Sequence, residues 1–197
     1  MSESFSTKPK APFRPVPARP GRGGPATRLA EILRVDQAGE LAAVHIYRGQ
    51  RAVLNRVPGM DRIAYQLQEM EAHEAEHLAA LNELVVGHKV RPTVMAPLWR
   101  AAAFALGAGT ALLGEKAAHA CTEAVETVIE QHYASQISEI EDAEPELAAD
   151  LARFREDELA HRDQALDEGA KGAPGYPLLA AVIRAGCRAA IRISERV

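Results

Sequence analysis

The sequence predicts an all-α fold: a four-helix bundle made from a duplicated helical hairpin. Over most of the chain, apolar residues recur every three or four positions, which is the spacing of one face of a helix. No stretch shows the sustained alternation of apolar and polar residues that is typical of a half-buried strand. The 197 residues are enough for one domain with a substantial buried core.

Proline and glycine divide the periodic part of the chain into five helices. The first helix ends before Pro58 and Gly59, a turn signal, and the fourth begins at Glu144 and Pro145, where proline suits a first turn. The first four helices are expected to form the bundle, and the fifth is amphipathic. The expected ranges are 27–55, 61–86, 113–140, 144–169 and 178–195.

Residues 1–26 are expected to form a disordered, proline-rich tail, and residues 27–197 a single domain. The tail has six prolines and no hydrophobic run, so burial cannot offset the entropy lost on ordering. It also lacks the apolar core of a secretory signal, and its prolines disfavour the amphipathic helix of a transit peptide.

Composition excludes several classes of protein. The chain has 23 basic and 27 acidic residues, a net charge of −4, so no general basic surface is available and no nucleic-acid partner is expected. Two cysteines, Cys121 and Cys187, are too few for a disulfide scaffold or a zinc ribbon.

The second and fourth helices share a motif. Glu74 and His77 lie on the inward stripe of the second helix, and Glu158 and His161 follow them by 84 residues on the fourth. Residues three apart lie on the same face of a helix, so each Glu-x-x-His pair points into the core.

The first and third helices contribute a second repeat. Glu40 and Glu126 are 86 residues apart, and each is followed seven residues later by a tyrosine, Tyr47 or Tyr133. Both glutamates lie in apolar stripes, which places them in the same core as the Glu-x-x-His pairs.

Four carboxylates and two imidazoles would therefore meet inside the bundle. An unpaired buried carboxylate is strongly unfavourable, and four together require cations. Two glutamates plus two Glu-x-x-His motifs is the ligand pattern of ferritin-like di-iron and di-manganese bundles. The sequence predicts a ferritin-like bundle that holds two divalent metals on Glu40, Glu74, His77, Glu126, Glu158 and His161.

One alternative uses overlapping residues. His73 to His77 match the zinc-peptidase motif H-E-x-x-H, in which the two histidines bind zinc and Glu74 is the general base. However, His73 lies outside the inward stripe, and Asp157 takes its place in the repeat. An iron-storage ferroxidase, a rubrerythrin-like peroxidase and a metal-free lipid-binding bundle are further alternatives, although a rubredoxin-type cysteine pair is lacking.

Other polar residues near the predicted centre are candidates for supporting roles. Asp36 and Asp157 are candidates to orient the metal-binding histidines. His132 and Tyr133 are candidates for a proton or electron path. The remaining histidines and acids near the stripes are expected to cap helices, pack or face solvent: His45, His88, His119, Glu71, Glu123 and Glu130.

Two segments favour contact with a membrane. Residues 94–113 carry a single charge, Arg100, and just reach the length of a bilayer span, but their proline and glycines favour a re-entrant or interfacial segment. In the last helix, arginines recur every four residues, as on a helix at an anionic membrane surface; a helix packed on the bundle is the alternative. The expected substrate and membrane contacts are Trp99, Phe104, Leu106, Arg184, Arg188 and Arg192.

The chain also resembles a known family, the demethoxyubiquinone hydroxylases, from about residue 28 to its end. The segments that carry the resemblance are RVDQAGE (34–40), RPT (91–93) with PLW (97–99), FALGAGTALLG (104–114), CTEAVE (121–126), HY (132–133), ELAH (158–161), AGCR (185–188) and SER (194–196). The family's metal ligands fall on the same six residues that the periodicity selects.

The resemblance implies a membrane-associated di-iron monooxygenase. Such an enzyme uses O2 to hydroxylate the ring of 2-polyprenyl-3-methyl-6-methoxy-1,4-benzoquinone in ubiquinone biosynthesis, with electrons ultimately from NADH and without a bound flavin. The implied partners are the polyprenyl quinone, membrane lipid, other ubiquinone-biosynthesis proteins including a lipid-binding accessory protein, and a second copy of the chain. The proline-rich tail favours the cytoplasmic face of a bacterial plasma membrane over the matrix side of the mitochondrial inner membrane.

Overall fold

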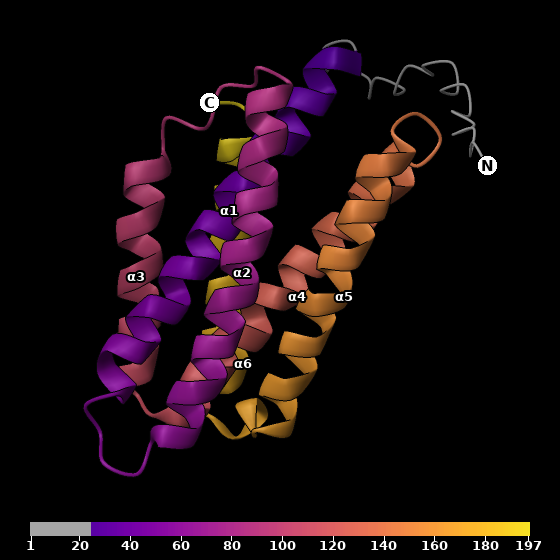
Figure 1. The fold of residues 1–197 in the computed structure, drawn as a ribbon. Coiled ribbons are helices and arrows are strands. Elements are labelled where there is room, and N and C mark those ends of the chain that lie inside the picture. Colours follow the sequence, from indigo (N-terminus) through magenta and orange to yellow (C-terminus); the bar gives the residue numbers. More distant parts are fainter. Residues whose placement is uncertain (1–24) are drawn as a thin grey trace, which may run out of the picture.

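The computed structural model describes residues 25–197, and the prediction of an all-α chain is confirmed there (Figure 1). This part of the chain contains no strand. The predicted disordered tail lies outside the described residues as far as residue 24. The elements are α1 (Pro25–Leu54), α2 (Asp61–Gly87), α3 (Ala96–Leu112), α4 (Glu115–Ile140), α5 (Pro145–Asp167), the short 3-10 helix η1 (Ala170–Gly172) and α6 (Tyr176–Ser194).

The predicted helix boundaries are close to those observed. α1 begins at Pro25, two residues before the expected start, since proline is well suited to a first turn. α4 begins two residues later than expected, because Gly114 adopts a φ of 108° and separates it from α3. Glycine adopts this left-handed conformation without steric strain.

The helices α1, α2, α4 and α5 form the bundle, in which α1 packs against α2 and α4 against α5. One apolar cluster joins all four helices through Leu33, Leu81, Tyr133 and Leu151. Another lies further along the bundle and contains Tyr47 together with Leu67 and Met70 of α2. The polar positions 40, 74 and 77 fall between these two clusters along α1 and α2, so an apolar core closes the site on both sides.

The apolar segment 94–113 contains one continuous helix, α3, which packs along α1 rather than forming a re-entrant turn (Figure 1). A Cβ atom at Gly107 would overlap the carbonyl oxygen of Ile46, and one at Gly49 would overlap that of Phe104. The two glycines therefore allow the backbones to approach closely. Within residues 25–197, no helix combines the length and apolar character needed to cross a bilayer.

The last helix, α6, packs along α4 in the way that α3 packs along α1. Apart from the short η1, the helices of residues 25–197 therefore form two halves of three helices each, α1–α2–α3 and α4–α5–α6. Trp99 of α3 donates a hydrogen bond from its indole nitrogen to Ser194 Oγ of α6 at 2.9 Å. The outer helices of the two halves are thus joined to each other as well as to the bundle.

Candidate metal centre

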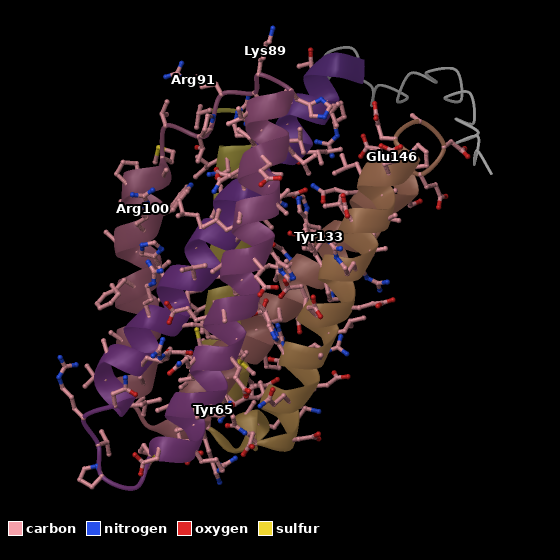
Figure 2. The ribbon with its side chains drawn as sticks, viewed as in Figure 1. Tyr65, Lys89, Arg91, Arg100, Tyr133 and Glu146 are labelled. Carbon is pink, nitrogen blue, oxygen red and sulfur yellow. The ribbon has the colours of Figure 1, made fainter. Side chains whose placement is uncertain are left out.

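Six ligand-type side chains meet in the middle of the bundle. Two glutamates, on α2 and α5, have no exposed surface, and the other four side chains are at most 4% exposed. Figure 2 labels Tyr133 of α4, which lies beside this group. The six residues are those selected by periodicity: Glu40, Glu74, His77, Glu126, Glu158 and His161.

The six side chains form two overlapping groups. Donor atoms of Glu40 and His77 lie within 4.8 Å of each other and of Glu74 and Glu158. Donor atoms of Glu126 and His161 have the same relation to Glu74 and Glu158. Two carboxylates are therefore shared, while each group has one glutamate and one histidine of its own. This arrangement suits two cations bridged by two carboxylates.

The hydrogen bonding of the cluster supports this interpretation. Every one of the six residues has at least one buried nitrogen or oxygen atom without a hydrogen bond, and both oxygens of Glu74 and of Glu158 lack one. The Nδ1 atoms of both histidines, which face the carboxylates, are among these atoms. Buried polar atoms rarely remain unpaired, because each costs about 1–3 kcal/mol. Two bound metal ions would satisfy them, so the residues fit a dinuclear centre.

Without metal, the cluster holds protons. Burial raises the pKa of Glu74 and of Glu126 well above the usual range, and the neighbouring carboxylates raise both further. Burial also opposes ionisation of Glu158, but His161 and His77 beside it lower its pKa to about 2. Burial alone would lower the pKa of His77, whereas Glu158 and Glu40 raise it to about 10. A cation that enters the cluster would displace these protons.

Glu40 and Glu126 each belong to only one of the two groups, and each accepts a hydrogen bond from a tyrosine across the bundle. The hydroxyl of Tyr47 on α1 donates to Glu126 Oε1 on α4 at 2.6 Å, and that of Tyr133 on α4 donates to Glu40 Oε1 on α1. Each hydrogen bond leaves the second oxygen of its glutamate unpaired. That oxygen is then available as a metal ligand.

Each histidine uses its outer nitrogen to contact the opposite half of the bundle. Nε2 of His77 lies 3.0 Å from Oδ2 of Asp157, one of the two aspartates predicted to orient such histidines. Nε2 of His161 lies 3.1 Å from Nδ1 of His73, and the two imidazole rings are stacked. Such hydrogen bonds fix the ring orientation of a metal-binding histidine. The contact of His73 was not predicted from the sequence, although positions 73 and 157 are equivalent in the repeat.

The position of His73 also bears on the zinc-peptidase alternative. His73 belongs to none of the groups of potential ligand atoms found in residues 25–197. Its Nδ1 points to His161, while His77 points to Asp157, so the two histidines of the H-E-x-x-H motif do not converge. The geometry disfavours a mononuclear zinc site on this motif.

Asp36, the other aspartate considered as a partner of a metal-binding histidine, contacts Gln136 and His132. Asp36 Oδ1 accepts a hydrogen bond from Gln136 Nε2 at 2.7 Å and lies 3.6 Å from His132 Nε2. Asp36 is one turn before Glu40 and faces residues of α4 on either side of Tyr133. It therefore forms a buried polar contact with His132, beside the cluster.

Three acids that were expected to cap helices, pack or face solvent form ion pairs with arginines. Glu71 pairs with Arg48 and Arg51, Glu130 with Arg155, and Glu123 with Arg184. Both oxygens of Glu123 accept hydrogen bonds from Arg184, at 2.6 and 2.8 Å. Arg184 therefore joins α6 to α4, and its membrane contact stays a prediction.

An apolar cavity of about 410 Å³ lies between α1, α3, α4 and α6. Of the residues predicted to contact substrate or membrane, Trp99 and Leu106 line this cavity, whereas Phe104 is 42% exposed and does not. Gly39 and Val125, which directly precede Glu40 and Glu126, also line the cavity. The cavity therefore reaches the backbone that carries two residues of the cluster. Arg188 and Arg192 instead line a separate cavity of about 320 Å³ that includes His132 and Gln136.

Comparison with known proteins identifies the family. The model of the family described as ubiquinone biosynthesis protein COQ7 matches residues 27–194. The chain belongs to the COQ7 family. The resemblance found in the sequence is thus confirmed.

Similar members of the COQ7 family come from bacteria and mitochondria. A 3-demethoxyubiquinol 3-hydroxylase of Rhodospirillum rubrum is 49% identical over 178 residues, which cover 90% of this chain and 82% of the relative. The mitochondrial NADPH-dependent 3-demethoxyubiquinone 3-hydroxylase of Homo sapiens is 48% identical over 170 residues, covering 84% and 76%. The mitochondrial 5-demethoxyubiquinone hydroxylase of Saccharomyces cerevisiae is 39% identical over 188 residues, covering 87% and 79%.

Proposed function

We propose that this protein is an O2-dependent di-iron monooxygenase that hydroxylates the ring of demethoxyubiquinone, a polyprenylated methoxy-benzoquinone, in ubiquinone biosynthesis. The observation that carries the proposal is the buried cluster of four glutamates and two histidines, in which every residue leaves a donor atom unpaired. The names of the COQ7 relatives support the substrate and the reaction.

In this proposal the cluster holds two iron ions per chain. Glu40 and His77 would hold one, Glu126 and His161 would hold the other, and Glu74 and Glu158, which belong to both groups, would contribute to both. When bound, the iron pair supplies O2 activation: one oxygen atom goes to the ring, and two electrons and two protons convert the other to water. Asp157 and His73 fix the two histidine rings, and Tyr47 and Tyr133 fix two of the carboxylates.

The apolar cavity is the proposed binding site for the quinone ring and the adjoining part of its tail. Its walls are apolar side chains of four helices, and it passes the residues next to Glu40 and Glu126. Such walls favour a prenylated quinone and exclude water. Electrons are proposed to come from a reduced pyridine dinucleotide, NADH or NADPH, since the human relative is named NADPH-dependent.

Peripheral membrane association is part of the same proposal. Large apolar side chains are exposed on α3 and α6, including Leu98, Leu112, Leu178 and Val182. These two helices border the cavity, so a membrane at this face would deliver a lipid-soluble quinone directly. The proposed location is the cytoplasmic face of a bacterial membrane. The proposed partners are a lipid-binding accessory protein and a second copy of the chain.

The test is hydroxylation by iron-loaded protein in detergent, with a reductant, demethoxyubiquinone and ¹⁸O2. The expected product carries one ¹⁸O atom in its new hydroxyl group, and Glu126→Ala abolishes its formation. Glu76→Ala, a change at an exposed position of α2, is the matched control and keeps the activity. Oxygen derived from water, or unchanged activity in Glu126→Ala, would contradict the proposal.

A pair of alanine variants tests the substrate cavity. Ala42 lines it, whereas Ala101 of α3 is exposed and does not. Ala42→Phe should lower turnover of the prenylated quinone without changing the iron content, and Ala101→Phe should leave both unchanged. Equal turnover in the two variants would contradict the assignment of this cavity as the substrate-binding site.

A further inference from the structure

A second group of potential metal ligands lies at one end of the bundle. Glu115 and His119 come from the first turns of α4, and Glu168 directly follows α5. One carboxylate oxygen of each glutamate and one ring nitrogen of His119 lie within 4.8 Å of one another. His119 precedes Glu126 by seven residues, about 10 Å along the helix, so this group is separate from the central cluster.

The group lies where α2 and α4 begin and α5 ends, at the lower end of the bundle in Figure 1. Tyr65 on α2 marks this end in Figure 2. Three segments distant in sequence therefore meet there. A ligand bound between them would connect the start of α4 to the end of α5.

His119 is the unusual member of this group. Its side chain is 1% exposed, yet neither ring nitrogen forms a hydrogen bond. Burial lowers the pKa of His119, so the ring is uncharged at neutral pH and one nitrogen has a free lone pair. If His119 only capped a helix or packed in the core, as expected from the sequence, both of its ring nitrogens would remain without a hydrogen bond, which is unfavourable for a buried polar group.

The two carboxylates already surround a positive charge. Arg62 at the start of α2 donates hydrogen bonds to Glu115 Oε1 at 2.8 Å and to Glu168 Oε1. Gln66 Nε2 also donates to Glu168, at 2.7 Å. The side chain of Arg62 is 59% exposed, so it can move into solvent without unfolding the bundle. Its guanidinium is thus a replaceable cation that keeps the two carboxylates close to His119.

We propose that Glu115, His119 and Glu168 form a mononuclear site for a divalent transition-metal cation such as Zn²⁺, for which Arg62 competes. One imidazole nitrogen and two carboxylate oxygens match the ligands of Zn²⁺ and similar metals, whereas Mg²⁺ and Ca²⁺ prefer oxygen ligands alone. Three protein ligands leave a coordination position for water. The site does not depend on what the central cluster binds.

The test is a zinc titration of the full chain after the central cluster has been loaded with iron and loosely bound metal has been removed on a chelating resin. Calorimetry gives the affinity, and elemental analysis counts iron and zinc separately. The expected result is one added zinc per chain with no loss of iron. No added zinc, or zinc gained only as iron is lost, would overturn the proposal.

Variants at partly exposed positions assign that zinc. Glu168→Gln should weaken binding by at least about tenfold, since loss of a ligand costs more than loss of a residue that orients one. Glu146→Gln, at an exposed position of α5, is the matched control and should bind as the unaltered chain does. Equal affinities in these two variants would place the zinc elsewhere and overturn the proposal.

Arg62→Ala gives the sharpest distinction between a metal site and a structural ion pair. If Arg62 competes with the metal, its removal should tighten zinc binding about two- to fivefold, the equilibrium equivalent of its weak, solvent-exposed ion pairing with the two carboxylates. A purely structural network predicts unchanged or weaker binding. His119→Gln and Glu146→Gln should also be compared by cobalt absorption: a Co²⁺ band lost in the first and kept in the second identifies the imidazole ligand, and a band kept in both would overturn the proposal.

Discussion

The two halves of the molecule, α1–α2–α3 and α4–α5–α6, are alike where they face each other and different where they face outward. Each half supplies one glutamate, one Glu-x-x-His motif and one tyrosine to the centre. Each tyrosine bonds to the glutamate of the opposite half. The centre is therefore built across the interface between the halves, and neither half contains a complete site.

The differences begin one residue before each motif. Position 73 is a histidine and its equivalent 157 is an aspartate, so one cluster histidine contacts an imidazole and the other a carboxylate. The outer helices differ as well: α3 approaches α1 through two glycines, whereas α6 is joined to α4 by the Arg184–Glu123 ion pair. The duplication thus preserves the ligand set, while the partners of the ligands and the outer packing diverge.

The largest expected effect comes from the two residues shared by both groups. Glu74→Ala and Glu158→Ala should each release both metals and lower hydroxylation by more than about 100-fold, since loss of an outer partner alone costs 10–100-fold. Metal content and turnover, measured together, check this. If one variant lost both metals and the other kept both, the two shared glutamates would not have equivalent roles, which would contradict this expectation.

The residues at positions 73 and 157 should give a smaller and unequal effect. Asp157→Asn should weaken the metal on the His77 side by about 10–100-fold, because a carboxylate partner makes a histidine a stronger donor. His73→Gln should cost less, since neither the imidazole that it removes nor the amide that it introduces is a carboxylate. Competition with a chelator, followed as two separate release steps, measures both. Equal costs would show that the charge of Asp157 has no influence on the site.

The outer helices should respond differently to the same substitution. Gly107→Ala should destabilise the fold by about 1–3 kcal/mol, because the added methyl group overlaps the backbone of Ile46. Gly186→Ala on α6 has open space and should be neutral or stabilising by up to about 1 kcal/mol. The free energy of unfolding of the two variants, measured by urea denaturation, checks both expectations. A neutral Gly107→Ala would mean that α3 does not depend on close contact with α1.

The smallest expected effect is the loss of one tyrosine hydroxyl. Tyr47→Phe and Tyr133→Phe each remove one hydrogen bond to a glutamate of the opposite half and should each cost about 0.5–1.5 kcal/mol in the metal-free protein. The two values should agree closely if the halves are equivalent here. Thermal unfolding of both variants measures the difference.

Much of the fold and of the candidate centre follows from local pattern. The range expected for the second helix, 61–86, differs from α2 by one residue, because periodicity and the flanking turn residues mark its ends. The six clustered residues follow from their regular spacing in a repeated hairpin. Repetition constrains which faces must meet, so it carries tertiary information that a single motif does not.

Other features depend on contacts that no local pattern contains. An apolar, glycine-containing helix is equally suited to a membrane surface and to close packing, and the match of Gly107 with Ile46 decides its packing. Asp36 lies on the inward side of α1, but only the position of α4 shows that it meets Gln136. Among the other members of this group, only Glu115 is close to His119 in the sequence. Glu168 and Arg62 are distant in sequence and come near His119 only in the folded chain.

The central claim is that one buried site, built from both halves, binds two metal ions. Its most direct test is the iron content per chain of detergent-purified protein after passage over a chelating resin, compared between the unaltered chain and Glu126→Ala. We predict two irons per chain, lost together in the variant. A single zinc that persists in Glu126→Ala and Glu158→Ala but disappears in His73→Ala would contradict the claim.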